Sequence, residues 1–311
     1  MTNIGVIGVG GWGKNHLRVL NELNCLKAIC DTNSDNLNEY SSRYKIPGYT
    51  NIDEMIKNEK LDGVIICTPT STHFEIASKI VKLKIPVFVE KPLASSSIEA
   101  EKLVKLVKEN NTILMVGYIE RFNSAVVYLK QLIKNGELGE PILLEFHREN
   151  RWSGNVKDVG IVHDTSVHDI DTARWLFSSE PKSIFSRIGS VSKSHDDFVM
   201  IMLGFKEDKT AFITSNWIPP KKTRELSAIF SNGIVKLDFI TQELIIENNE
   251  GTKRPRINKA EPLVLELKNF IECIEGKSKP LITGKDALNT NRIADAVVSS
   301  SNTGSPIYLE L

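Results

Sequence analysis

Cysteine is scarce in this chain, with four residues in 311: Cys25, Cys30, Cys67 and Cys273. These four form no CxxC pair and no cluster with histidine along the sequence. We therefore expect neither a disulfide framework nor a structural metal site. Cys67 ends an apolar run at residues 64–67, where a free thiol is expected to be buried.

The chain also has no excess of charge, because 39 lysines and arginines balance 39 aspartates and glutamates. A neutral surface provides no general attraction for nucleic acid. No run approaches the ~18 uncharged apolar residues that a membrane span needs. The N-terminus begins in a strand pattern without the basic region of a secretory leader. We therefore expect a cytoplasmic protein that binds neither nucleic acid nor a membrane.

Up to residue 119, short β-rich runs alternate with helical patterns. The predicted strands are residues 4–7, 26–30, 63–67, 87–89 and 113–116. The predicted helices are residues 15–23, 37–44, 52–58, 73–83 and 98–109. Strands separated by helices are typical of βαβ units, in which helices cover both faces of a parallel sheet. The pattern predicts an α/β domain over residues 1–119 with a doubly wound parallel sheet.

The pattern changes after residue 120. Helices are predicted over 124–134, near 165–177, near 262–275 and near 285–300, and strands over 142–147, 198–205, 210–217, 225–230 and 233–239. Successive strands with few helices between them indicate a largely antiparallel sheet. We therefore predict a second, α+β domain with an open sheet over residues 120–311. No linker rich in Pro, Gly or Ser separates the two domains.

Residues 8–13 read Gly-Val-Gly-Gly-Trp-Gly and fit the pattern G-x-G-x-x-G. They lie between a predicted strand and a predicted helix, the context in which this pattern binds a dinucleotide. Gly8 permits the tight turn, Gly10 admits the pyrophosphate, and Gly13 lets the helix pack on the strand. Asp31, at the end of the second strand, would bind ribose hydroxyls and repel a 2′-phosphate, which favours NAD over NADP. The alternative is a tight turn without a ligand.

A second polar segment, residues 67–73, reads Cys-Thr-Pro-Thr-Ser-Thr-His and follows a later strand. Ligands of doubly wound sheets gather at this edge, so Thr68 and His73 could line the cofactor. The alternative, compatible with the first, is a helix start with Ser71 or Thr72 as its N-cap.

A third segment, residues 90–92, reads Glu-Lys-Pro and again follows a strand. Lys91 could donate to a substrate hydroxyl or to the nicotinamide ribose; by itself it would be a surface lysine. The residues that we expect to bind the cofactor are Gly8, Gly10, Gly11, Trp12, Gly13, Asp31, Thr68, Pro69, His73, Glu90 and Lys91.

In the second half of the chain, Asp164 and His168 are spaced i, i+4 within a predicted helix and would share one face. A carboxylate beside an imidazole can orient the ring and raise its pKa, which suits a general base near neutral pH. The alternative is that Asp164 caps the helix and that His168 is an ordinary helical histidine.

G-x-G-x-x-G at residues 8–13, Glu-Lys-Pro at 90–92 and Asp-x-x-x-His at 164–168 occur in that order. Together they resemble the glucose-fructose oxidoreductase/inositol dehydrogenase/MocA (Gfo/Idh/MocA) family over essentially the whole chain. The resemblance implies a Rossmann domain, a second domain with an open antiparallel sheet, and a dimer or tetramer built on that sheet's outer face. It also implies that Lys91, Asp164 and His168 are catalytic, with His168 as the base and Lys91 as the partner of the reacting hydroxyl.

Residues 158–163 read Asp-Val-Gly-Ile-Val-His, where many members have a glycine-rich stretch. Together with residues 10–16, 117–123 and 217–224, this segment resembles the nucleotide-sugar 3-dehydrogenase branch of the family. Enzymes of that branch oxidise UDP-N-acetylglucosamine or its uronic acid at C3. Such a substrate needs cations for its pyrophosphate and hydrogen bonds for its sugar. The expected substrate-binding residues are Lys91, Tyr118, Arg121, Asn123, Arg148, Asp164 and His168, with Arg151, Lys221, Lys222 and Arg224 as further cations. For each basic residue the alternative is a solvated charge.

Three other functions stay open at this point. The substrate could be the uronate, with Arg148 or Arg151 as its extra basic partner, or a free sugar or inositol. The chain could also be a non-catalytic NAD-binding redox sensor, although the presence of Lys91, Asp164 and His168 together argues against this. We therefore expect an NAD-dependent dehydrogenase of a UDP-amino sugar that uses no metal.

Overall fold

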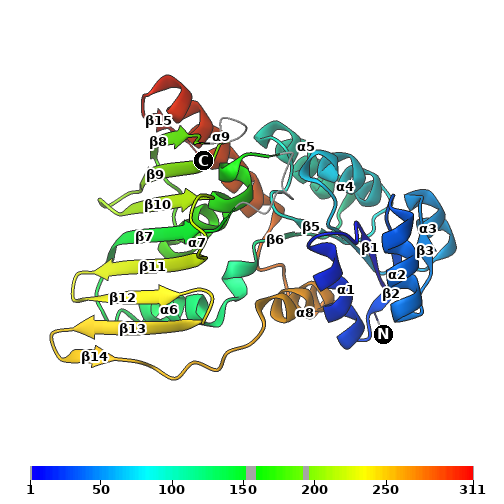
Figure 1. Cartoon of the computed structure of the whole chain (residues 1–311), viewed down its shortest axis with the longest axis horizontal. Coiled ribbons are helices and arrows are strands. Elements are labelled where there is room, and N and C mark those ends of the chain that lie inside the picture. Colours follow the sequence, from blue (N-terminus) through cyan, green and yellow to red (C-terminus); the bar gives the residue numbers. More distant parts are fainter. Residues whose placement is uncertain (1, 152–158, 192–195, 311) are drawn as a thin grey trace. The chain divides into compact units, whose positions relative to one another are not determined.

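The chain divides into two units in the computed structural model, which describes residues 2–151, 159–191 and 196–310. The first unit comprises Met1–Tyr118 and Leu263–Leu288. The second comprises Ile119–Pro262 and Asn289–Leu311. Each unit has its own sheet (Figure 1).

The sheet of the first unit has six strands in the order β3-β2-β1-β4-β5-β6, and all of its pairs are parallel. Its strands are β1 (Ile4–Ile7), β2 (Leu26–Cys30), β3 (Gly48–Tyr49), β4 (Gly63–Ile66), β5 (Val87–Glu90) and β6 (Leu114–Gly117). Every residue of β1, β4, β5 and β6 is buried, as expected for strands covered on both faces. The predicted doubly wound parallel sheet is confirmed.

Helices flank this sheet on both sides, with α1 and α8 on one face and α4 and α5 on the other (Figure 1). The helices are α1 (Gly13–Glu22), α2 (Ser34–Tyr44), α3 (Ile52–Asn58), α4 (His73–Lys82), α5 (Ser97–Asn110) and α8 (Pro262–Ile274), with the short η1 (Thr70–Thr72) before α4. Asn33, Asn51 and Ser96 cap α2, α3 and α5 by accepting from backbone N–H groups.

Helix α8 belongs with the first sheet, although the sequence places it in the second domain. The Phe270 ring meets Phe88 of β5 edge-to-face at 5.7 Å. Ile274 fills the space beside Gly63 of β4, where an added Cβ would lie 2.6 Å from its side chain. Because of this apolar packing on β4 and β5, residues 263–288 belong to the first unit. The predicted single boundary at 119/120 does not describe this division of the chain.

The sheet of the second unit has nine strands in the order β14-β13-β12-β11-β7-β10-β9-β8-β15. They are β7 (Pro141–Glu149), β8 (Ser183–Gly189), β9 (Phe198–Gly204), β10 (Thr210–Asn216), β11 (Thr223–Phe230), β12 (Gly233–Asp238), β13 (Glu243–Asn248), β14 (Gly251–Lys253) and β15 (Ile307–Tyr308). The pair β7–β10 is parallel and the other pairs are antiparallel. The predicted largely antiparallel sheet is confirmed.

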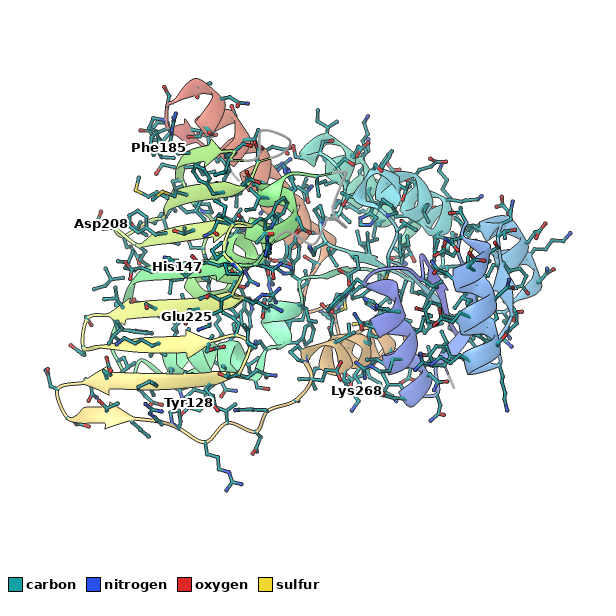
Figure 2. The ribbon with its side chains drawn as sticks, viewed as in Figure 1. Tyr128, His147, Phe185, Asp208, Glu225 and Lys268 are labelled. Carbon is teal, nitrogen blue, oxygen red and sulfur yellow. The ribbon has the colours of Figure 1, made fainter. Side chains whose placement is uncertain are left out.

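Burial alternates along most of these strands because helices cover one face. The helical segments of this unit are η2 (Ile119–Phe122), α6 (Ser124–Asn135), η3 (Val162–Ser166), α7 (Val167–Phe177) and most of α9 (Gly284–Thr303). On the opposite face, Met200 and Phe212 are exposed, and Figure 2 marks the cross-strand neighbours His147 and Glu225. The resemblance implies oligomer contacts on this face. In the described ranges, no helix is long and apolar enough to cross a membrane.

Candidate functional site

The glycine turn between β1 and α1 has the steric form that the sequence predicts. Gly8 has φ +85°, and an added Cβ would lie 2.8 Å from the backbone of Cys67. An added Cβ on Gly13 would lie 2.0 Å from the Gly8 carbonyl oxygen, so helix and strand approach closely only with glycine there. An added Cβ on Gly11 meets nothing within 4 Å, and Trp12 is half exposed. The turn therefore leaves its outer side open to a pyrophosphate.

Asp31 lies beside this turn, directly after β2. Its Oδ2 accepts a hydrogen bond from the Val9 N–H at 2.7 Å, and its Oδ1 accepts one from the Asn33 N–H at 2.8 Å. These bonds hold the carboxylate next to the glycine turn, where the ribose of a dinucleotide would present its hydroxyls. Gly8, Gly10, Gly13 and Asp31 thus fit NAD as a group, whereas their contacts with it stay predictions.

Side-chain hydrogen bonds hold residues 68–73, the segment that leads into α4, so this segment is not open to a ligand on all sides. The Thr72 hydroxyl lies 2.7 Å from Thr68 Oγ1 and 2.8 Å from the Pro69 carbonyl, and it makes no capping bond to α4. His73 is 1% exposed, with Nε2 2.9 Å from the Thr68 carbonyl and Nδ1 2.8 Å from the Pro92 carbonyl. Both ring nitrogens therefore face protein carbonyl groups, of which a neutral ring donates to one, and this burial argues against a direct contact between the ring and the cofactor.

The Glu90-Lys91-Pro92 turn begins at the last residue of β5, with a cis peptide bond between Lys91 and Pro92. Glu90 is 7% exposed; its Oε1 lies 2.7 Å from Nε2 of His16, and its Oε2 accepts from the Lys91 N–H at 3.2 Å. Both oxygens of the Glu90 carboxylate therefore bind groups of the protein. Lys91, the next residue, is half-buried. His16, three residues after Gly13, was absent from the predicted site.

Cys67 lies next to this pair, although no cysteine–histidine cluster is evident in the sequence. Its Sγ and the ligand atoms of His16 and Glu90 lie within 4.8 Å of one another. Metals bind the thiolate form of cysteine. Burial, followed by the Glu90 and Glu266 carboxylates, raises the pKa of the Cys67 thiol well above its usual value. The thiol is thus neutral, and the hydrogen bond between His16 and Glu90 accounts for the other two groups.

In the second unit, the segment that carries Asp164 is a π-helical turn, η3, followed directly by α7 with His168. Asp164 Oδ2 accepts from the Thr165 hydroxyl at 3.1 Å, and Thr165 Oγ1 accepts from Trp217 Nε1 at 2.9 Å. The residue before α7 is Ser166, so Asp164 does not cap that helix. π-Helical turns often occur at functional sites. Both predicted catalytic residues are half-buried, and Asp158 lies outside the described residues.

Arg121 and Arg148 are not available to a substrate in the way that the sequence suggests. Arg121 forms two hydrogen bonds, of 2.8 and 2.7 Å, with buried Asp171. Arg148 bonds Asp169 at 2.6 Å and Glu120 at 3.2 Å, and it is 2% exposed. Burial would lower the pKa of Arg148, but the two carboxylates raise it above its usual value. Both guanidinium groups are therefore paired with carboxylates in the interior of the unit, and their assignment to the substrate is not supported.

Asn123 and Tyr118 are also buried, each 1% exposed. The Asn123 side chain caps α6 by accepting from the Ala125 N–H at 3.1 Å, and its amide donates to the Phe239 carbonyl at 2.9 Å. These bonds use both ends of the Asn123 amide, so its expected contact with the sugar is not supported.

Lys222 and Arg224 differ from the buried arginines because no carboxylate in the described ranges lies within hydrogen-bonding distance of either. Arg224 NH1 is 3.9 Å from Glu120, which already binds Arg148, and Arg224 Nε has no hydrogen-bond partner in the described chain. Burial and then Arg148 lower the pKa of Arg224; burial, then Arg224, lower that of Lys222. Asp164 interacts electrostatically with Arg224. Arg224 therefore lies near a predicted catalytic residue, whereas Lys222 is exposed, and neither has a carboxylate within hydrogen-bonding distance among the residues that the structure describes.

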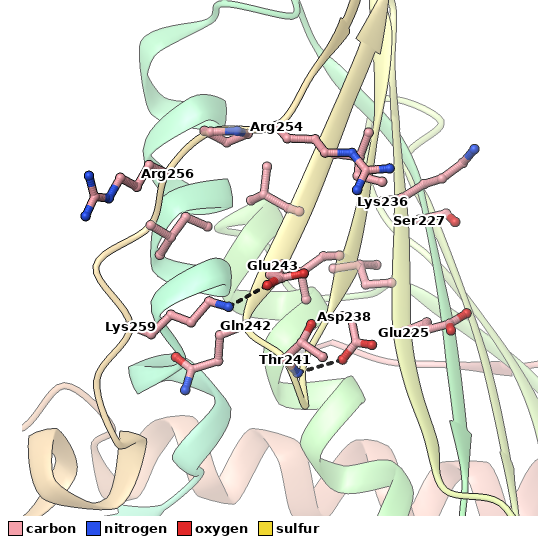
Figure 3. Close-up of a pocket in the computed structure, with 16 residues that line it drawn as sticks. Glu225, Ser227, Lys236, Asp238, Thr241, Gln242, Glu243, Arg254, Arg256 and Lys259 are labelled. Atoms are coloured by element: carbon pink, nitrogen blue, oxygen red, sulfur yellow. Dashed lines mark hydrogen bonds and ion pairs between the residues drawn. The ribbon is translucent and has the colours of Figure 1, made fainter.

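The second unit also has a cavity of about 710 Å³ between β11–β13 and the arm of residues 254–259 (Figure 3). Charged residues of both signs line it, among them Lys236, Arg254 and Glu243, and Lys259 pairs with Glu243 at 2.6 Å. Among the described residues, no predicted catalytic or cofactor residue lines this cavity. The residues that line this cavity therefore differ from those predicted for catalysis and cofactor binding.

Two family models match the chain along most of its length. The model described as "Oxidoreductase family, NAD-binding Rossmann fold" matches residues 2–118. The model described as "GFO/IDH/MocA C-terminal domain" matches residues 126–236. This chain belongs to the GFO/IDH/MocA oxidoreductase family. Its first domain is accordingly an NAD-binding Rossmann domain, which confirms the predicted cofactor.

Curated relatives of this GFO/IDH/MocA member differ in their substrates. The myo-inositol 2-dehydrogenase of Thermotoga maritima is 27% identical, with 91% of each chain covered. The UDP-N-acetylglucosamine 3-dehydrogenase of Acidithiobacillus ferrooxidans is 24% identical, with 87% of this chain and 88% of the relative covered. The two are similarly distant, so the family is shown but the branch is not.

Solved structures share the fold of this GFO/IDH/MocA member. The A. ferrooxidans UDP-N-acetylglucosamine 3-dehydrogenase superposes with a TM-score of 0.90 at 22% identity, over 97% of this chain and 98% of the other. An Agrobacterium radiobacter oxidoreductase in complex with NAD+ and tartaric acid gives 0.91 at 18% identity, over 99% and 98%. At these identities the likeness establishes the fold alone.

Proposed function

We propose that this protein is an NAD-dependent dehydrogenase that oxidises the C3 hydroxyl of a UDP-amino sugar, UDP-N-acetylglucosamine first, to the 3-keto sugar. The observation that carries the proposal is Arg224, which interacts electrostatically with Asp164 and has no carboxylate within hydrogen-bonding distance among the described residues. Lys222 lies close to it along the chain as a second cation. A substrate pyrophosphate would provide the missing counter-ion and complete the hydrogen bonding of the Arg224 guanidinium. A neutral sugar or polyol would not supply this partner for the Arg224 guanidinium.

In this proposal His168 accepts the proton of the reacting hydroxyl, and Lys91 binds and polarises its oxygen. NAD, when bound, supplies the hydride acceptor. Asp164 orients the imidazole or accepts its proton, and the π-helical turn fixes Asp164 through Thr165 and Trp217. The rest of the catalysis is positioning, because the glycine turn and Asp31 hold the dinucleotide while the two cations hold the substrate.

Substitution of the two cations tests the substrate. In Arg224→Gln and in Lys222→Gln, kcat/KM for UDP-N-acetylglucosamine should fall by about 10- to 100-fold, the equivalent of a lost charge-assisted hydrogen bond. Turnover of any neutral polyol should change by less than about twofold, because it makes no use of the charge. Lys236→Gln is the matched control: this exposed lysine on β12 pairs with Glu247 at 3.0 Å. Equal losses for charged and neutral substrates would overturn the proposal.

The second candidate is an NAD-dependent polyol dehydrogenase. The 27% identity to a myo-inositol 2-dehydrogenase favours it. The same residues would serve as base and hydroxyl partner, since the reacting group is again a secondary alcohol. The first candidate predicts that Arg224→Gln lowers turnover of the UDP-sugar. The second predicts that the polyol is the substrate turned over and that Arg224→Gln leaves its turnover unchanged, so the experiment above separates them.

A further inference from the structure

Two buried histidines hold the turn that carries Lys91. His16 comes from α1 and His73 from α4, helices on opposite faces of the six-stranded sheet (Figure 1). His16 Nε2 lies 2.7 Å from Glu90 Oε1, and His73 Nδ1 lies 2.8 Å from the Pro92 carbonyl oxygen. An imidazole from a different helix therefore lies against each flank of Lys91 in the sequence.

The Glu90 carboxylate connects His16 to Lys91. One oxygen meets the His16 ring, and the other accepts from the backbone N–H of Lys91 at 3.2 Å. An added Cβ on Gly117 of β6 would lie 3.0 Å from this carboxylate, so the group is confined against the neighbouring strand. A carboxylate bound at both oxygens has one position, and that position sets where the Lys91 backbone begins.

His16 itself is confined by its surroundings. The ring is fully buried and packs edge-to-face on Phe88 at 5.6 Å. Its Nδ1 has no hydrogen-bond partner in the described part of the chain, whereas Nε2 faces the carboxylate. The tautomer with the proton on Nε2 satisfies the carboxylate and leaves only an unprotonated nitrogen without a partner, which costs less than a buried N–H without one.

We propose that His16 is a positioning residue, which acts through Glu90 to place Lys91 for its contact with the reacting hydroxyl. This inference rests on the proposed function, because the role of Lys91 comes from there. His16 does not touch substrate in this account. Its loss leaves a buried carboxylate with one donor fewer and lets the turn shift, and misplacement of a catalytic group by about 1 Å can cost about 100-fold in rate.

Two polar variants of similar size distinguish a positioning role of His16 from a role in folding. In His16→Gln the side-chain amide nitrogen can occupy the place of Nε2 and donate to Glu90. In His16→Asn the amide ends where Nδ1 lies and cannot reach the carboxylate. We expect kcat to fall by about 10- to 100-fold in His16→Asn and to recover in His16→Gln, with KM for NAD within about twofold in both. Arg18→Ala on the surface of the same helix, where Arg18 pairs with Glu22, is the control.

A second readout needs no substrate. Hydrogen exchange at the Lys91 amide, measured by mass spectrometry on peptides that span it, should speed up in His16→Asn and match the wild type in His16→Gln. Wild-type exchange and kcat in His16→Asn, or equal defects in both variants with exchange raised throughout the unit, would overturn the proposal. If His16→Asn does not fold, His16→Leu replaces it with the same expectations. Absence of turnover in the wild-type enzyme would refute the proposed function, while the exchange result would still decide the role of His16.

Discussion

The arginines of this chain differ in their surroundings, and this difference is the reason that we propose only Arg224 among them for substrate recognition. Arg121 and Arg148 each face a buried aspartate, whereas the nearest carboxylate to Arg224 among the described residues is Glu120, at 3.9 Å, which Arg148 already binds. The sequence shows how many cationic residues the chain has, but it does not show which of them pair with a carboxylate that is distant along the chain. The sequence could therefore name the basic residues but not separate the structural ones from those available to a substrate.

Replacement of His168 tests the residue on which the chemistry depends. His168→Ala should reduce turnover by roughly 10²- to 10⁴-fold, because it removes the proposed general base. NAD affinity, measured by calorimetry, should be nearly unchanged, since the glycine turn and Asp31 lie in the other unit. His163→Ala is the matched control, as this histidine pairs with Asp295 at 3.1 Å. Near-normal turnover of His168→Ala would contradict the assignment.

The elements of the first unit could be predicted because hydrophobic periodicity and turn residues are local signals. Four buried strands appear as apolar runs, and the glycine motif begins α1. The π-helical turn at Val162–Ser166 could not be predicted from the i, i+4 spacing of Asp164 and His168. Its anchors, Trp217 and Ser215, lie near the end of β10 and become neighbours only in the folded unit.

The close packing of β1 against α1 leads to a prediction about how these two elements fit together. Gly13→Ala places a methyl group 2.0 Å from the Gly8 carbonyl, so the backbone must shift. We expect a loss of about 1–3 kcal/mol in the free energy of unfolding, together with weaker NAD binding. Thermal or urea unfolding measures the first and calorimetry the second. Gly11→Ala, where no atom lies within 4 Å, should keep wild-type stability; equal stability of both variants would contradict the packing argument.

At the scale of the whole molecule, family membership and the NAD-binding domain are established, and the substrate is a proposal. The order of the three motifs along the sequence indicated the family, and the two matched domains, residues 2–118 and 126–236, agree with it. The return of α8 to the first unit was not predictable, because an amphipathic helix does not specify which sheet it covers. Relatives that act on inositols and on UDP-N-acetylglucosamine are about equally similar.

The most direct test of the account is the reduction of NAD by purified protein within the first turnover, followed by absorbance. The substrates are UDP-N-acetylglucosamine, its uronate, free N-acetylglucosamine and myo-inositol. A first-turnover measurement is needed because an unfavourable equilibrium toward the 3-keto sugar would hide a steady rate. The account predicts reduced nicotinamide with UDP-N-acetylglucosamine and far less with the free sugar or the polyol. Reduction by myo-inositol without reduction by either UDP-sugar would contradict it.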